Sequence, residues 1–294
     1  MRSKNLNDPA TIESRSGTHQ VPVLHTPENW MIGDTTPIMH LLDERYPSRR
    51  MFPVGPAGVL VQALEEYFDE WVARTMVHYR WHYPESAEFA SLKMAEGNSE
   101  VAERVRSWGP RACRATGTDS EVQRQAAEDE YRRIIEAAEH QLTNTRYLLG
   151  DRPTAVDCIV LGGLRAHTLM DPDPDPKRVY TDYAEVVAFN EGSRDAWDGS
   201  GEIDFSQPTE FTEFVARGMV STYQPYIIAN RDAQRAGAKA FHASIYGEDV
   251  SYLSRPYPER SRQMIVNRLT GLPNDAREWV SNWFQERGLT AFSG

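Results

Sequence analysis

The stretch "THQVPVLHTPENWMIGDTTPIMHLLDERYP", Thr18 to Pro47, holds two short apolar runs and then the start of a helix. The β-branched run Val21–Leu24 and the run Trp30–Gly33 are separated by five residues. Pro27 and Asn29 lie in this connection, and both residue types are typical of turns. The pattern therefore predicts a short β-hairpin.

A helix is expected directly after the hairpin. Pro37 suits a first helical position, because its missing N–H group would have no partner there in any case. Ile38, Leu41 and Leu42 follow at helical spacing and form an apolar stripe. Pro47 should end the helix, since the residue before a proline is pushed towards extended geometry.

Length, charge and cysteine content limit the classes of protein to consider. The chain has 294 residues, enough for one large domain or two ordinary ones. Its 43 acidic and 32 basic residues give a net charge of −11, which disfavours nucleic acid and anionic membranes as partners. No apolar run approaches the roughly 20 residues that span a bilayer, and no secretory signal is recognisable at the start. With two cysteines, these features predict a cytoplasmic protein without nucleic-acid or membrane partners.

Long helical patterns begin after the turn-rich connection that follows Pro47. Apolar residues recur at three- and four-residue spacing over Val59–Tyr83 and over Glu121–Leu142, which predicts two amphipathic helices. Thr154 and Asp157 have the spacing of a capping box ahead of the apolar run Cys158–Leu164. This run is apolar on nearly all sides, so it should form a buried central helix.

The remainder of the chain mixes connectors and helices. The run "DPDPDP", residues 171–176, should be a stiff connector because each aspartate precedes a proline. Helical patterns follow over about Thr181–Gly192 and over Thr209–Ala238, the second interrupted or kinked at Pro225. The tail is expected to combine a short extended segment with one or two helices.

Taken together, these pieces resemble the glutathione transferase family. The sharpest matches are "QVPVL", "IGDTTPIMHLLDERYP" and "YLLGDRPTAVDC". The resemblance implies a mainly α fold, in which an all-helical C-terminal domain is preceded by a partial thioredoxin-like α/β segment. The expected division is residues 1–50 for the glutathione-binding segment, 56–241 for the helical domain and 242–294 for a C-terminal extension.

The resemblance also implies a glutathione site. Pro22 is similar to the cis-proline of the thioredoxin-like domain, and the backbone of Val21 would bind the cysteinyl part of glutathione in the manner of an added strand. Asp34 and Thr35 would receive the γ-glutamyl end, at a helix N-terminus that favours a carboxylate. The alternative is that Asp34, Thr35 and Thr36 are only helix-capping residues.

A hydrophobic electrophile would bind elsewhere. In the family, the first long helix of the helical domain contributes to the electrophile pocket, which implies this role for Tyr79, Trp81, His82 and Tyr83. Ordinary packing between helices is the alternative for each of them.

The part of the family pattern that carries the thiol-activating Tyr, Ser or Cys has no match here. Only about 20 residues precede "QVPVL", too few for a βαβ unit, so the catalytic residue is unknown. The leading hypothesis is a glutathione transferase-like protein that conjugates or exchanges the thiol of glutathione with a hydrophobic electrophile. The alternative is a non-catalytic binding or interaction protein derived from a truncated transferase, and a glutathione-dependent isomerase or lyase would share the same site. A homodimer is possible.

Two cysteines and a pair of histidines are further candidates for reactive or metal-binding side chains. Arg111 and Arg114 flank Cys113 and could lower the pKa of its thiol, whereas Cys158 is expected in the core. His78 and His82 lie one helical turn apart, as a pair of metal ligands would, but no third ligand is evident and no metal is expected.

Overall fold

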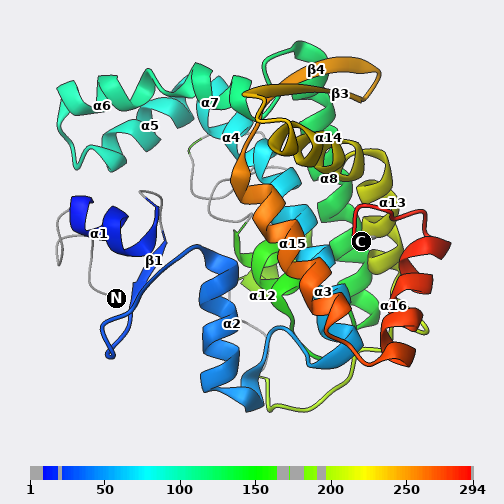
Figure 1. The fold of residues 1–294 in the computed structure, drawn as a ribbon. Helices are drawn as coiled ribbons and strands as arrows, with labels where there is room; N and C mark the ends of the chain where they lie inside the picture. The colour runs from blue at the N-terminus through cyan, green and yellow to red at the C-terminus, as the bar shows by residue number, and fades with distance from the viewer. Residues whose placement is uncertain (1–8, 19–21, 164–171, 173–181, 191–196, 293–294) are drawn as a thin grey trace. The chain divides into compact units, whose positions relative to one another are not determined.

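The computed structural model describes residues 9–18, 22–163, 172, 182–190 and 197–292. The chain divides into two compact units, Met1–Pro53 and Val54–Gly294. Helices dominate, and the described strands form two small antiparallel sheets, which confirms the mainly α fold (Figure 1). None of the described helices combines the length and the apolar composition that a membrane-spanning segment needs.

The first unit contains the predicted hairpin and helix. Its elements are α1 (Pro9–Ser16), β1 (Val23–His25), β2 (Met31–Gly33), α2 (Thr35–Arg45) and the 3₁₀ turn η2 (Pro47–Arg49). Strands β1 and β2 pair antiparallel, with Val23 opposite Gly33 and His25 opposite Met31. Helix α2 begins at Thr35, two residues before the predicted first position at Pro37, and it ends before Pro47, as predicted.

The second unit is built mainly from helices. They are α3 (Gly55–Glu66), the π-helical η3 (Tyr67–Val72), α4 (Ala73–His82), α5 (Pro84–Met94), α6 (Ser99–Arg106), α7 (Gly109–Ala115), α8 (Glu121–Asn144), α9 (Ala155–Asp157), the π-helical η4 (Cys158–Gly163), α12 (Ala184–Asn190), α13 (Glu210–Ser221), α14 (Tyr223–Arg235), α15 (Pro256–Thr270) and α16 (Asn274–Glu286). Strands β3 (Ala240–Ile245) and β4 (Glu248–Leu253) form its hairpin.

The two long helices predicted from periodicity are present. α3, η3 and α4 follow one another without a gap from Gly55 to His82, and α8 covers Glu121–Asn144. The α8 carboxylate of Glu130 accepts hydrogen bonds from Tyr67 and Trp71 of η3. This buried contact fixes α8 against the π-helical turn.

The capping interaction at α9 is also as predicted. Oδ2 of Asp157 accepts from the N–H group of Thr154 at 2.7 Å and from its hydroxyl at 2.9 Å. Oδ1 accepts from the N–H group of Leu148 at 2.8 Å, so one carboxylate joins the preceding turn to the helix start. The prediction for Cys158 was wrong, because this side chain is exposed.

Two predictions for the C-terminal half need correction. The helical pattern Thr209–Ala238 breaks at Thr222, between α13 and α14, and not at Pro225. Pro225 lies in the first turn of α14, where its missing N–H group costs nothing. The expected short extended segment is a full hairpin of two six-residue strands, β3 and β4. The "DPDPDP" connector lies outside the described residues, apart from Pro172.

Candidate functional site

The first candidate site lies in the first unit, where the hairpin meets helix α2. Asp34 follows β2 and is the N-cap of α2, which begins at Thr35. The N–H group of Asp34 donates to the carbonyl of Pro22 at 3.0 Å. The structure therefore brings Pro22, Asp34 and Thr35 together, whereas Val21 lies outside the described residues.

Asp34 has a strained backbone. Its φ of 80° and ψ of 150° fall in a region that is essentially reserved for glycine. Holding a side chain there costs on the order of 1–3 kcal/mol, and such strain clusters at sites that bind ligands. The unusual backbone makes Asp34 a candidate functional residue by geometry, beyond its place in the sequence pattern.

Only one of the two oxygens of the Asp34 carboxylate has a hydrogen-bond partner among the described residues. Oδ1 accepts from the N–H group of Thr35 at 2.6 Å. Oδ2 is buried and has no hydrogen-bond partner among the described residues. Burial raises the pKa of this carboxyl above its usual value. A cationic group placed beside Oδ2 would supply the missing partner and favour the ionised form.

The N-terminus of α2, directly after Asp34, also provides groups that can bind an anion. Thr35 is exposed at the first position of α2, an eleven-residue helix whose N-terminal N–H groups and dipole favour a carboxylate. A carboxylate acceptor beside a helix N-terminus matches a ligand that carries an ammonium and a carboxylate on one carbon. The γ-glutamyl end of glutathione has this chemistry.

The aromatic residues expected to contact an electrophile lie at the end of α4. The ring of Tyr79 is buried and lies 5.9 Å from the ring of Tyr83 and 5.7 Å from that of Tyr131. Trp81 packs against Gly109, where an added Cβ would fall 3.1 Å from the indole. Trp81, His82 and Tyr83 are half-buried and keep some exposed surface. Their role in an electrophile pocket stays a prediction.

Four polar side chains form a chain of contacts beside these aromatics. His78 Nε2 lies 2.7 Å from a Glu128 oxygen that also accepts from the hydroxyl of Tyr83. His78 Nδ1 lies 2.8 Å from Nδ1 of His82, which is 3.5 Å from the sulfur of Cys113. Sequence reasoning found the two histidines but missed Glu128, because 50 residues separate it from His78.

The electrostatics of these contacts disfavour a reactive thiol. Burial raises the pKa of Cys113, and this effect exceeds the lowering by nearby arginines. Arg114 does lower the pKa of the thiol, but the burial of Cys113 outweighs this effect, so the flanking arginines do not produce a thiolate. Burial, together with the neighbouring His78, lowers the pKa of His82 to about 4.

The described His, Cys, Asp and Glu side chains are the possible ligands of a metal ion. Within them, no group of three or more His, Cys, Asp or Glu side chains is placed to hold a metal ion. His78 and His82 contact each other, and His78 also contacts Glu128. Their close approach is explained by hydrogen bonding.

Part of the chain matches a known protein family. Residues 97–191, the range from just before α6 to just after α12, match the family model "Glutathione S-transferase, C-terminal domain". No curated protein and no solved structure matches the chain.

Proposed function

We propose, from the premise that this chain belongs to the glutathione transferase family through its C-terminal domain, that it binds glutathione at Pro22, Asp34 and Thr35. The observation that carries the proposal is Asp34, whose backbone is strained and whose Oδ2 has no described partner beside the start of α2. The ammonium of the γ-glutamyl group would pair with Oδ2. Its carboxylate would bind the hydroxyl of Thr35 and the helix N-terminus.

The proposed reaction is conjugation of glutathione with a hydrophobic electrophile. The deprotonated thiol attacks an electrophilic carbon, a sulfur–carbon bond forms, and a leaving group departs with its electron pair. The proton released from the thiol passes to solvent. Trp81, His82 and Tyr83 are the proposed contacts for the electrophile, together with the buried Tyr79. A cytoplasmic location and a homodimer are part of the same proposal.

Calorimetric titration with glutathione tests the site. We expect saturable binding, weakened by about 1 kcal/mol or more in Thr35→Ala, the usual size of a lost hydrogen bond to a charged group. Ser48→Ala is the matched control, because Ser48 is an exposed hydroxyl residue of the same unit in η2. Equal weakening by both variants would remove Thr35 from the site.

A shortened ligand tests which end of glutathione meets the site. Cysteinylglycine lacks the γ-glutamyl group, so it should bind more weakly, and Thr35→Ala should weaken it no further. If Thr35→Ala weakens both ligands equally, the residue does not contact the γ-glutamyl end. No binding of glutathione at millimolar concentration would exclude the proposal.

A measurement of turnover distinguishes the proposed enzyme from the alternative, a non-catalytic binding protein. An activated aryl chloride, with glutathione in excess, should release chloride faster with the protein than without it. Saturable binding of glutathione with no acceleration for aryl chlorides or for α,β-unsaturated carbonyl electrophiles would favour the binding protein.

A further inference from the structure

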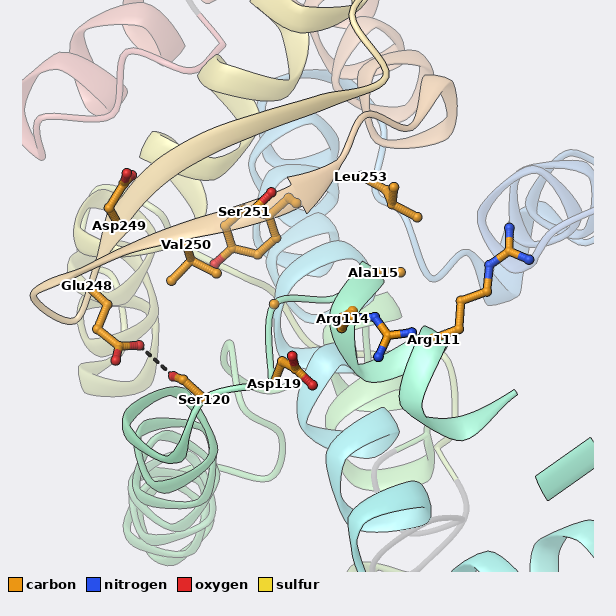
Figure 2. Close-up of a pocket in the computed structure, with 12 residues that line it drawn as sticks. Arg111, Arg114, Ala115, Asp119, Ser120, Glu248, Asp249, Val250, Ser251 and Leu253 are labelled. Atoms are coloured by element: carbon orange, nitrogen blue, oxygen red, sulfur yellow. Dashed lines mark hydrogen bonds between the residues drawn. The ribbon is translucent and has the colours of Figure 1, made fainter. Parts of the chain in front are cut away.

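A cavity of about 780 Å³ lies along β4 in the second unit (Figure 2). All six residues of β4 line one wall, whether their side chains point towards the core or away from it. The opposite wall comes from α7 and the connection to α8, and its residues are Arg111, Arg114, Ala115, Gly117, Asp119 and Ser120. The cavity is therefore a groove that follows the edge of the strand, and it is called the β4 groove below.

The backbone groups on this edge are available for pairing. Ser254 donates its N–H group to the carbonyl of Lys239 at 3.0 Å, and the two lie in the register of the β3–β4 pair. Hydrogen-bonded and non-bonded pairs alternate in antiparallel sheets. The N–H and C=O groups of Asp249, Ser251 and Leu253 consequently point away from β3, into the β4 groove. No other described strand pairs with this edge.

The β4 groove has a basic and an acidic end. Figure 2 shows Glu248 and Asp249 at the hairpin turn, with Arg111 towards the end of β4 that carries Leu253. The hydroxyl of Ser120 donates to Glu248 at 2.5 Å and joins the two walls at the acidic end. Arg111 and Arg114 are exposed, and neither forms an ion pair with a described residue. These two charges are available to an occupant.

A buried tyrosine, Tyr252, also lines the β4 groove. Tyr252 is only 2% exposed, and its hydroxyl has no hydrogen-bond partner among the described residues. Its ring packs so closely on Gly117 that a Cβ there would fall 2.2 Å from the ring. The ring of Tyr252 therefore fills the space between β4 and Gly117 and forms part of the groove wall.

We propose that the β4 groove binds an extended peptide that adds to β4 as an antiparallel strand. Addition of a strand uses the outward backbone groups of β4, and antiparallel pairing is slightly more stable per residue than parallel pairing. The N-terminal half of the peptide then lies at Arg111 and Arg114 and is acidic. Its C-terminal half lies at Glu248 and Asp249 and is basic.

The shape of the groove favours a single strand over a second copy of the protein. Six residues of strand extend about 20 Å at roughly 3.3 Å per residue, which sets the length of the peptide at six or seven residues. Helix α7 forms the opposite wall, so it would obstruct the edge of another sheet. Pairing of β4 with β4 of a second copy would bring two such α7 walls into the same space.

The charge order is tested with two pools of blocked, fluorescein-labelled heptapeptides. One pool begins with Glu-Glu and ends with Lys-Lys, the other has the reverse order, and both carry mixtures of Val, Ile, Thr and Tyr at the three central positions. Fluorescence anisotropy with the full chain should show saturable binding of the first pool, about fivefold or more tighter than the second. Equal binding of the two pools, or binding of neither, would overturn the proposal.

A proline substitution tests the strand pairing itself. Ser251→Pro removes an outward N–H group at an edge where proline is tolerated, and should weaken binding of the first pool about tenfold or more. Ser251→Ala keeps the N–H group and should bind as the wild-type chain does. Equal binding by the two variants, with thermal unfolding confirming that both are folded, would contradict strand addition.

Charge reversal gives a second test that does not depend on the backbone of β4. The double variant Arg111→Glu, Arg114→Glu should weaken binding of the first pool about tenfold at low salt, with a smaller effect at high salt. Arg260→Glu is the matched control, because Arg260 is exposed on α15 and does not line the groove. If the double variant binds as Arg260→Glu does, the assigned charge order is wrong.

Discussion

Two carboxylates, the buried Glu130 of the second unit and the partly buried Asp34 of the first, differ in how their oxygens are used. Glu130 is 4% exposed, and its two oxygens accept from the hydroxyl of Tyr67, the indole of Trp71 and the guanidinium of Arg74. Asp34 has one oxygen bonded to the N–H group of Thr35 and a second, buried oxygen without a described partner. The backbone of Glu130 is regular helix, whereas that of Asp34 is strained.

The difference separates a stabilising role from a binding role. A buried acid whose hydrogen bonds are all made contributes to stability, and removing it leaves its donors unpaired. A strained acid with a free oxygen lowers stability and is retained where a ligand uses it. The two residues should therefore respond in opposite directions when they are replaced.

The largest expected effect is at Glu130. Glu130→Gln places amide hydrogens against the buried donors of Tyr67, Trp71 and Arg74, so it should lower the free energy of unfolding by about 3–5 kcal/mol. Urea unfolding followed by circular dichroism measures this loss. Glu121→Gln on the same helix is the control, because the Glu121 side chain is 82% exposed and its ion pair with Arg124 is worth about 0.5 kcal/mol or less. A loss at Glu130 no larger than in the control would show that its hydrogen bonds do not stabilise the unit.

A smaller effect is expected at Asp157. Asp157→Asn turns an amide towards the N–H groups of Leu148 and Thr154, which should cost about 2 kcal/mol at pH 5. Burial raises the pKa of this carboxyl from 3.8 to about 6. Between these values the folded chain holds a proton that the unfolded chain has released, so the contribution of Asp157 to stability falls as the pH rises.

The pH dependence distinguishes this carboxylate from an ordinary cap. Asparagine does not titrate, so the cost of Asp157→Asn should be larger at pH 5 than at pH 7, as measured by urea unfolding at both values. Asp151→Asn, at an exposed position nearby in the chain, provides the control. An equal cost at both pH values would mean that the pKa of Asp157 is not raised in the folded chain.

The elements that could be predicted from the sequence are those specified by neighbouring residues. The hairpin, the end of α2 before Pro47 and the bond from Thr154 to Asp157 depend on residues within a few positions of one another. The partners of Glu130 and His78 could not be predicted, since 63 residues separate Glu130 from Tyr67 and 50 separate Glu128 from His78. Periodicity identifies the buried face of a helix but not what packs on it.

The burial of the two cysteines also depends on contacts that the local sequence does not reveal. The sequence predicts Cys158 in the core, but its side chain is exposed in η4, whereas Cys113 is buried. Cys113 lies in α7 against α4, and a helix contact of this kind is not visible from flanking arginines. For the candidate site, the sequence indicated Pro22, Asp34 and Thr35, but the positive φ of Asp34 required the structure.

The smallest expected change in stability, and the most informative, is at Asp34. Asp34→Gly relieves the strain at φ 80° and loses little as a cap, so it should raise the free energy of unfolding by about 1 kcal/mol in urea. The same variant removes the carboxylate, so glutathione binding measured by calorimetry should be lost or greatly weakened. Glu96→Gly, at another residue with positive φ, should leave binding unchanged. Destabilisation by Asp34→Gly with unchanged glutathione binding would contradict this expectation. Asp34 would then stabilise the fold as Glu130 does, and its strained backbone would not be explained by ligand binding.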